Sequence, residues 1–164
     1  MDDFEITIDT KAMDEALSRL PEKVQGRIAR EALQKAGDIM LEAQKFLCPE
    51  RTDDMPGSDA LEPGVLKESL TTQVIISTKG EVARVKVGAP SETAHVARWV
   101  NDGHDIYKGG RKRASKKKKA GKFLGHVEGN HFLEGAFDES AQKAIDAMLT
   151  AIGEGLKNDS EGGE

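Results

Sequence analysis

A long helical period in the first third of the chain constrains the fold more than any other feature. From Pro21 to Leu47, apolar side chains recur every three or four residues between charged and amide side chains: Val24, Ile28, Ala32, Ile39, Ala43 and Phe46 or Leu47. This spacing aligns them on one face of a helix. Pro49 ends the period, because the residue before a proline is disfavoured in helical conformation. The sequence therefore predicts a long helix over residues 21–47.

A second helical period lies near the other end of the chain. Between His131 and Leu156, one apolar stripe is formed by Leu133, Phe137, Ala141, Ala144, Ile145, Met148, Leu149 and Ile152. This stripe predicts a second long helix. The residues after it, 158–164, are polar, and we expect them to form a disordered tail.

Shorter elements are expected at both sides of a predicted β-hairpin. The runs 72–78 and 81–88 flank Lys79-Gly80, and the second alternates apolar with basic residues, which is typical of a hairpin with one face in water. Short helical segments are expected around 66–70 and, capped by Ser91, up to Gly103. Before them all, alternating residues 4–8 predict a strand, and helical spacing follows it up to Leu20.

Together these elements indicate an α+β fold: an antiparallel β-sheet with a long N-terminal helix and a long C-terminal helix packed on one face. A length of 164 residues suits one domain, which we place at residues 1–157. The segments 49–64 and 105–126 are rich in glycine, proline or charge, and we expect both to be mobile loops.

Charge is distributed very unevenly along the chain. The whole chain has 24 basic and 29 acidic residues, a net charge of -5. Residues 108–122, which we call the basic segment, hold nine basic residues and no acidic one, so 24 minus nine leaves 15 basic against 29 acidic residues elsewhere, or -14. The nine are Lys108, Arg111, Lys112, Arg113, Lys116, Lys117, Lys118, Lys119 and Lys122.

The basic segment predicts an anionic partner. Like charges at this density oppose compact folding until they are neutralised. Duplex DNA and an acidic protein surface both qualify, and binding to DNA would be independent of sequence and sensitive to salt. The segment itself has no aromatic residue for base stacking, which argues against single-strand recognition. The simpler alternative is a solvated charged run that only keeps the chain soluble.

Motifs for catalysis or for metal binding are weak. His104, Asp105 and His131 are the candidates for a hydrolase site, but no two histidines have the tight helical spacing of a strong metal motif. The glycines near Lys122 do not match a phosphate-binding loop. The single cysteine, Cys48, ends an apolar helical run and is expected to be a buried structural thiol. We therefore expect no enzymatic activity, no cofactor and no metal.

Three short motifs follow one another in a characteristic order. Pro49 and Thr52 precede the segment Leu66-Lys67-Glu68-Ser69-Leu70, a stretch from Ala94 to His104 contains Trp99 and Gly103, and Phe132 is followed by Ala136. In this order the chain resembles the tail-completion, or minor tail, protein family of long-tailed bacteriophages over roughly residues 12–155. It departs from the family pattern in an insertion around Pro56–Pro63, at Asn101, Asp102 and His104, and in lacking a proline before Phe132.

The resemblance implies a function that composition alone does not. It implies a non-enzymatic structural protein of the virion neck, forming a homo-oligomeric ring, sixfold like the tail tube, that contacts tail terminator and head-tail connector proteins. Packaged DNA is a further candidate partner. No apolar run approaches the roughly 20 residues of a membrane span, so we expect host cytoplasm during assembly and then the virion. The alternative is a free intracellular accessory protein that binds DNA without sequence specificity.

Overall fold

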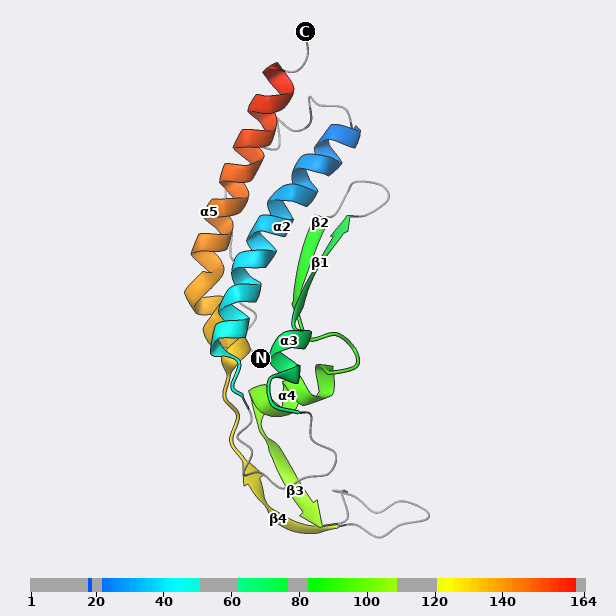
Figure 1. Ribbon diagram of the computed structural model, residues 1–164, viewed down its shortest axis with the longest axis vertical. Helices are drawn as coiled ribbons and strands as arrows, with labels where there is room; N and C mark the ends of the chain where they lie inside the picture. The colour runs from blue at the N-terminus through cyan, green and yellow to red at the C-terminus, as the bar shows by residue number, and fades with distance from the viewer. Residues whose placement is uncertain (1–17, 19–21, 51–61, 77–82, 109–120, 162–164) are drawn as a thin grey trace.

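The computed structural model describes residues 18, 22–50, 62–76, 83–108 and 121–161 of the chain. The molecule is elongated: a pair of long helices lies beside one β-hairpin, short helices close the lower end, and another hairpin projects beyond them (Figure 1). In chain order the elements are α2 (Glu22–Leu47), α3 (Val65–Ser69), β1 (Thr71–Ile76), β2 (Ala83–Gly88), α4 (Ala94–Asp102), β3 (His104–Lys108), β4 (Lys122–Val127) and α5 (Phe132–Glu161).

The helices α2 and α5 form the body of the molecule. They run antiparallel, and their contact is the largest between any two described elements. A buried cluster joins them: Ile28, Ala32, Ala151 and Ile152. Gly155 permits their close approach, because a Cβ at this position would lie 2.9 Å from Cγ1 of Ile28. The apolar stripes of the two helical periods therefore cover each other.

The antiparallel hairpin β1–β2 packs on α2. At the centre of this contact is Gly37, where an added Cβ would lie 2.5 Å from Cγ2 of Thr72 and 2.7 Å from Cγ2 of Val85. The Thr72 hydroxyl donates a hydrogen bond to the carbonyl oxygen of Gly37 at 3.3 Å. Only glycine therefore fits at position 37 without displacing the hairpin.

A second core lies below the helix pair, where four elements meet. Its buried members are Cys48, Leu66, Leu70, Ala97 and Phe132. Phe132, at the start of α5, is 1% exposed and is among the largest fully buried side chains of the described residues. Ser69 links α3 to the residue before α4: its hydroxyl donates to the carbonyl oxygen of Leu66 at 2.7 Å and lies 2.9 Å from the Thr93 hydroxyl oxygen.

Cys48 belongs to this second core. Its side chain is buried, and burial raises the pKa of the thiol, while the nearby Lys67 ammonium acts in the opposite direction. The expectation of a buried thiol is confirmed.

The predicted fold class is confirmed, with different boundaries. The first long helix begins at Glu22, one residue after the predicted start, and ends at Leu47 as expected. The C-terminal helix continues to Glu161, so residues 158–161 are helical and the expected tail is wrong there. None of the described helices is both long enough and apolar enough to span a membrane.

Two further expectations need correction. The segment 105–126 is not one loop, since residues 104–108 and 122–127 form β3 and β4, whose backbone groups bond to each other in a second sheet separate from β1–β2. Ser91 does not cap α4: the helix begins after Thr93, whose hydroxyl contacts Ser69 instead. The predicted strand at residues 4–8 and the helix that follows it lie outside the described residues, Ser18 excepted.

Candidate interaction surface

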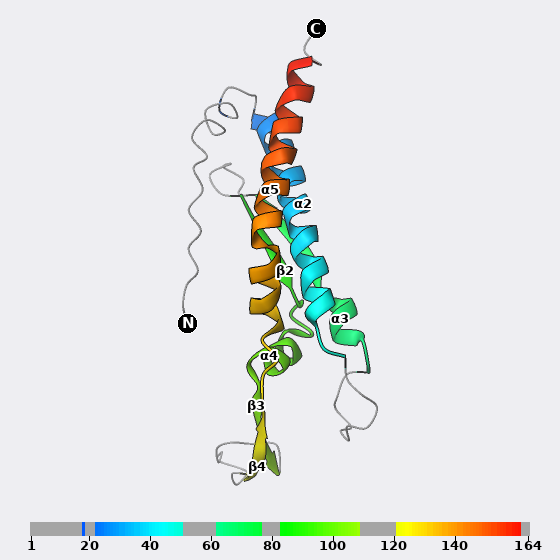
Figure 2. The ribbon, with the colours of Figure 1, turned by 90° about the vertical axis from the view of Figure 1, so that its left-hand side faces the viewer.

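The hairpin β3–β4, which we call the arm, projects from the body. Its strands pair with each other, and no other described element contacts them extensively. Figures 1 and 2, seen at right angles, both show it pointing away from the helix pair. A hairpin of only two strands is marginally stable alone in water, and its outer edges offer backbone groups to a further partner. The arm is thus an element that a second surface would complete.

The two ends of the basic segment, Lys108 and Lys122, lie in the strands of the arm. Lys108 ends β3 and pairs with Lys122, which begins β4, and both side chains are exposed. The fold thereby brings two of the nine predicted contact residues onto neighbouring strands. The other seven lie outside the described residues: Arg111, Lys112, Arg113, Lys116, Lys117, Lys118 and Lys119.

Exposed apolar side chains are concentrated on the arm. Of the six large hydrophobic residues found exposed in the described chain, four lie here: Ile106 at 42%, Phe123 at 53%, Leu124 at 58% and Val127 at 38%. The strand register shifts after Ile106, so that Leu124 has no residue opposite it and forms a bulge. Apolar surface gathered in this way is typical of a binding site for another macromolecule.

Side-chain contacts on one face hold the arm together. Nδ1 of His126 lies 2.9 Å from Oδ1 of Asp105, and the Tyr107 hydroxyl donates to the other carboxylate oxygen at 3.4 Å. The rings of Tyr107 and Phe123 meet edge to face with centroids 5.6 Å apart. These contacts order the strands up to the base of the basic segment.

The residues considered for a hydrolase site do not converge. The His104 ring lies 5.5 Å from the Trp99 ring, between centroids, at the base of the arm. His131 precedes α5 in a left-handed conformation with φ of 55°. Asp105 instead faces His126 on the neighbouring strand of the arm. Within the described ranges, no group of three or more histidine, cysteine or carboxylate side chains is placed to hold a metal ion.

The buried side chain of Asn101 joins the base of the arm to α5. Its Oδ1 accepts a hydrogen bond from the backbone N–H of Leu133 at 3.0 Å. Its Nδ2 donates to Asp102 at 2.7 Å and to Oε1 of Glu134 at 3.1 Å. One amide group, 3% exposed, therefore bonds both the end of α4 and the first turn of α5.

Two glycines allow the backbones to touch at this junction. Gly103 has φ of 77°, and a Cβ there would collide with the carbonyl oxygen of Val127. A Cβ at Gly129 would collide with the carbonyl oxygen of Asn101. The backbone N–H of His131 also donates to that carbonyl at 3.0 Å. The chain entering the arm is thus packed directly against the chain leaving it.

Seven of the eight motif residues that carry the family resemblance are described, and two of them, Leu66 and Phe132, belong to the second core. The eight are Pro49, Thr52, Leu66, Ser69, Trp99, Gly103, Phe132 and Ala136. Leu66, Phe132 and Ala136 are buried, Ser69 bridges to Thr93, and Gly103 makes the tight turn into the arm. Trp99 is 48% exposed, with its ring edge to face with His95 at 5.2 Å between centroids. Pro49 is exposed two residues after the end of α2, and Thr52 lies outside the described residues.

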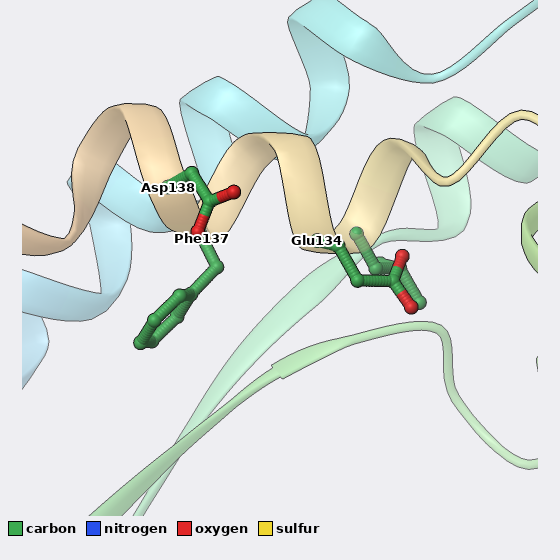
Figure 3. A pocket seen from close by; sticks show the side chains of 4 residues that line it. Glu134, Phe137 and Asp138 are labelled. Carbon is green, nitrogen blue, oxygen red and sulfur yellow. The ribbon is translucent and has the colours of Figure 1, made fainter. Parts of the chain in front are cut away.

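A shallow, open groove lies over the first turns of α5. It has a volume of about 210 Å³ and is lined by Leu133, Glu134, Phe137 and Asp138. This spacing makes the four residues neighbours on the helix surface, and Figure 3 shows the labelled side chains leaving α5 along this stretch. The groove thus offers two apolar side chains beside two carboxylates. The helix as a whole carries seven acidic and two basic residues.

The apolar and aromatic part of the arm was missed by the sequence analysis. Tyr107 and Phe123 are the residues immediately before and after the basic segment. Their position beside it is the signal by which the sequence could have identified them. An exposed aromatic ring, that of Phe123, is therefore present at the base of the basic segment. The lack of aromatic residues argues against base stacking by the lysine-rich stretch between the strands. It does not argue against base stacking by the arm, which carries Phe123.

Comparisons with known proteins return no match: no protein-family model, no curated protein and no solved structure is significantly similar to this chain.

Proposed function

We propose that this protein is a structural subunit of the neck of a long-tailed bacteriophage, a tail-completion protein whose copies form a ring where tail joins head. The observation that carries the proposal is the contrast between an acidic, well-packed body and an exposed arm that presents Lys108 and Lys122. In an assembly, neighbouring subunits cover the exposed strand edges and apolar side chains of such an arm. The proposed position in the virion neck comes from the order of the motifs that resemble the tail-completion family.

The basic segment gives the arm an electrostatic role in this proposal. In a ring, the basic segments of all subunits would lie around one circle, and together they would raise the local concentration of positive charge. Packaged DNA or the acidic face of an adjacent ring protein is then bound without sequence preference.

Deleting the gene tests the proposal directly. We expect lysates to contain full heads and separate tails by electron microscopy, and we expect mass spectrometry to find the protein in washed wild-type particles. Normally joined, infectious particles from the deletion strain would overturn the proposal.

The second candidate, an intracellular DNA-binding accessory protein, is favoured by the same basic segment on an exposed arm. The two candidates differ in location and assembly. Strong binding of duplex DNA by the monomer, together with absence of the protein from washed particles, would select the accessory protein.

Charge reversal tests the segment itself. Changing Lys116, Lys117, Lys118 and Lys119 to glutamate should leave the fold intact and weaken binding to duplex DNA. The log-log salt slope should fall by about 0.9 for each phosphate that the protein no longer neutralises. The matched control reverses four cations elsewhere: Lys45, Lys86, Arg98 and Lys143. Equal weakening in both variants would show that only net charge matters, and the segment would then be a solubilising run.

A further inference from the structure

We infer that the arm lies in the major groove of duplex DNA, where Leu124 and Phe123 cover the edges of bases while Lys108 and Lys122 bond to phosphates. The inference rests on the proposed function and deepens it, because it selects DNA as the partner of the arm and adds a contact with the bases.

The arm has a shape that this groove admits. The major groove of B-DNA is about 12 Å wide and accepts a two-stranded β-ribbon. β3 and β4 form such a ribbon, and no other described element packs extensively on it. The ribbon points away from the helix pair in both views (Figures 1 and 2). It can therefore enter the groove while the body stays outside.

The distribution of charge favours contact with DNA through the arm. Lys108 and Lys122 lie opposite each other with exposed side chains, at the two ends of the basic segment. Helix α5, by contrast, carries seven acidic and two basic residues. Phosphates are thus attracted to the arm and repelled by this part of the body.

The single acidic residue in the two strands does not oppose this contact. Asp105 is the second residue of β3, at the end of the arm next to α4. Its Oδ1 lies 2.9 Å from Nδ1 of His126, and its Oδ2 accepts a hydrogen bond from the Tyr107 hydroxyl at 3.4 Å. The half of the arm that carries the lysines has no acidic residue.

The apolar side chains of the arm are placed to contact bases. Phe123 and Leu124 directly follow Lys122 in β4 and are both more than half exposed. Leu124 occupies the bulge and has no residue of β3 opposite it, whereas Phe123 packs against the Tyr107 ring. In the major groove, apolar side chains contact the 5-methyl group of thymine. Such a contact removes both apolar surfaces from water.

Two other partners fit the arm less well. A second arm would bring another nine basic residues to the same place, and the two sets would repel each other. An acidic protein surface would match the arm only if it carried carboxylates on both sides of an apolar centre. Duplex DNA offers the equivalent at every thymine, because rows of phosphates border a groove whose floor carries methyl groups.

Replacing thymine by uracil in a duplex tests the contact with the bases. The replacement removes the 5-methyl groups from the major groove and leaves every phosphate in place. We expect the full chain to bind the uracil duplex more weakly, by about fourfold for each methyl group that it covers. Fluorescence anisotropy at one fixed salt concentration measures both affinities, with no change to the protein.

An apolar variant assigns the thymine preference to the arm. Leu124→Ser should bind the thymine duplex about tenfold more weakly. It should also discriminate less between the two duplexes and keep the salt dependence of the wild type. The control is Phe46→Ser, which removes an exposed ring from α2 and should bind like the wild type. Circular dichroism checks the fold of each variant.

A charge variant should show the converse behaviour. Lys108→Gln with Lys122→Gln should lower the log-log salt slope by about 0.9 for each lost phosphate contact. It should keep the thymine preference of the wild type. The control is Lys86→Gln with Lys143→Gln, which removes two exposed ammonium groups from the body and should leave the slope unchanged.

Equal affinity of the wild type for both duplexes, or a thymine preference that persists unchanged in Leu124→Ser, would overturn the inference. Tighter binding to a single strand, or to polyglutamate, than to duplex DNA would overturn it in favour of that partner. These outcomes are separable from failure of the proposed function. Thymine-dependent binding by a protein absent from washed particles removes only the neck, and a protein present in particles without that dependence removes only this contact.

Discussion

The helix pair and the arm differ in how far their apolar side chains are buried. Phe132 begins α5 and is 1% exposed, whereas Phe123, nine residues earlier in β4, is 53% exposed. The body covers most of its apolar surface through the contact of α2 with α5 and through the second core, with Phe46 of α2, 81% exposed, as an exception. No other described element packs extensively on the arm. The body therefore buries its largest apolar side chains within the chain, whereas the arm leaves those of Phe123 and Leu124 exposed.

Replacing each phenylalanine by alanine should separate the two regions most strongly. Phe132→Ala should lower the free energy of unfolding by about 3–5 kcal/mol, the usual cost for a buried phenylalanine. Phe123→Ala should cost less than about 1 kcal/mol, because it removes only the edge-to-face packing with Tyr107. Urea unfolding at concentrations where the chain is monomeric measures both. Similar costs would contradict the distinction between body and arm.

A substitution at the junction between the body and the arm should have an intermediate effect on the free energy of unfolding. Asn101→Ala leaves the Leu133 N–H without its acceptor and should cost roughly 1–3 kcal/mol. Asn158→Ala, at an exposed position of α5, is the control and should be close to neutral. Hydrogen exchange at Leu133 should accelerate only in the first variant; unchanged exchange there would mean that Asn101 does not anchor the arm.

Two glycines of α2 test how tightly the body is packed. Gly26→Ala meets no atom within 4 Å and should stabilise the helix by about 0.5–1 kcal/mol. Gly37→Ala gains the same helical preference but meets Thr72 and Val85, and overpacking of about 1–3 kcal/mol should leave it destabilised. Thermal unfolding of the pair gives the sign of each change. A stabilised Gly37→Ala variant would show that β1–β2 shifts freely on α2.

The smallest expected effect concerns Cys48. Burial raises the pKa of its thiol above the ordinary value of 9.0, so folding favours the protonated form. The resulting contribution to the free energy of unfolding is complete below pH 9.0 and is lost as the pH rises through the raised pKa. The difference between wild type and Cys48→Ala should thus be constant at neutral pH and decrease in alkali. An increase in alkali would mean that Lys67 stabilises the thiolate more than burial opposes it.

The elements with strong local signals could be predicted from sequence. The period of α2 and the stop at Pro49 placed that helix within one residue, and Gly103 correctly marked the end of α4. The β1–β2 hairpin followed from alternation around Lys79-Gly80.

The arm had no such local signal. Its strands are short, the bulge at Leu124 breaks the alternation, and the basic segment separates residues that pair. The junction is equally invisible, because the bond from Leu133 to Asn101 spans 32 positions. The position of the groove depends on which side of α5 is not covered by α2, and helical spacing alone does not reveal that side.

The backbone contacts at Gly103 and Gly129 have a geometric consequence for any assembly made through the arm. They hold the arm at its angle to α5, and in such an assembly that angle would contribute to the rotation from each copy to the next. The same rotation, repeated, decides how many copies complete a circle. A side chain inserted at either glycine would change the angle, so circumference, and with it the width of the central channel, would be determined by two residues that lie at the base of the arm and not in the interface.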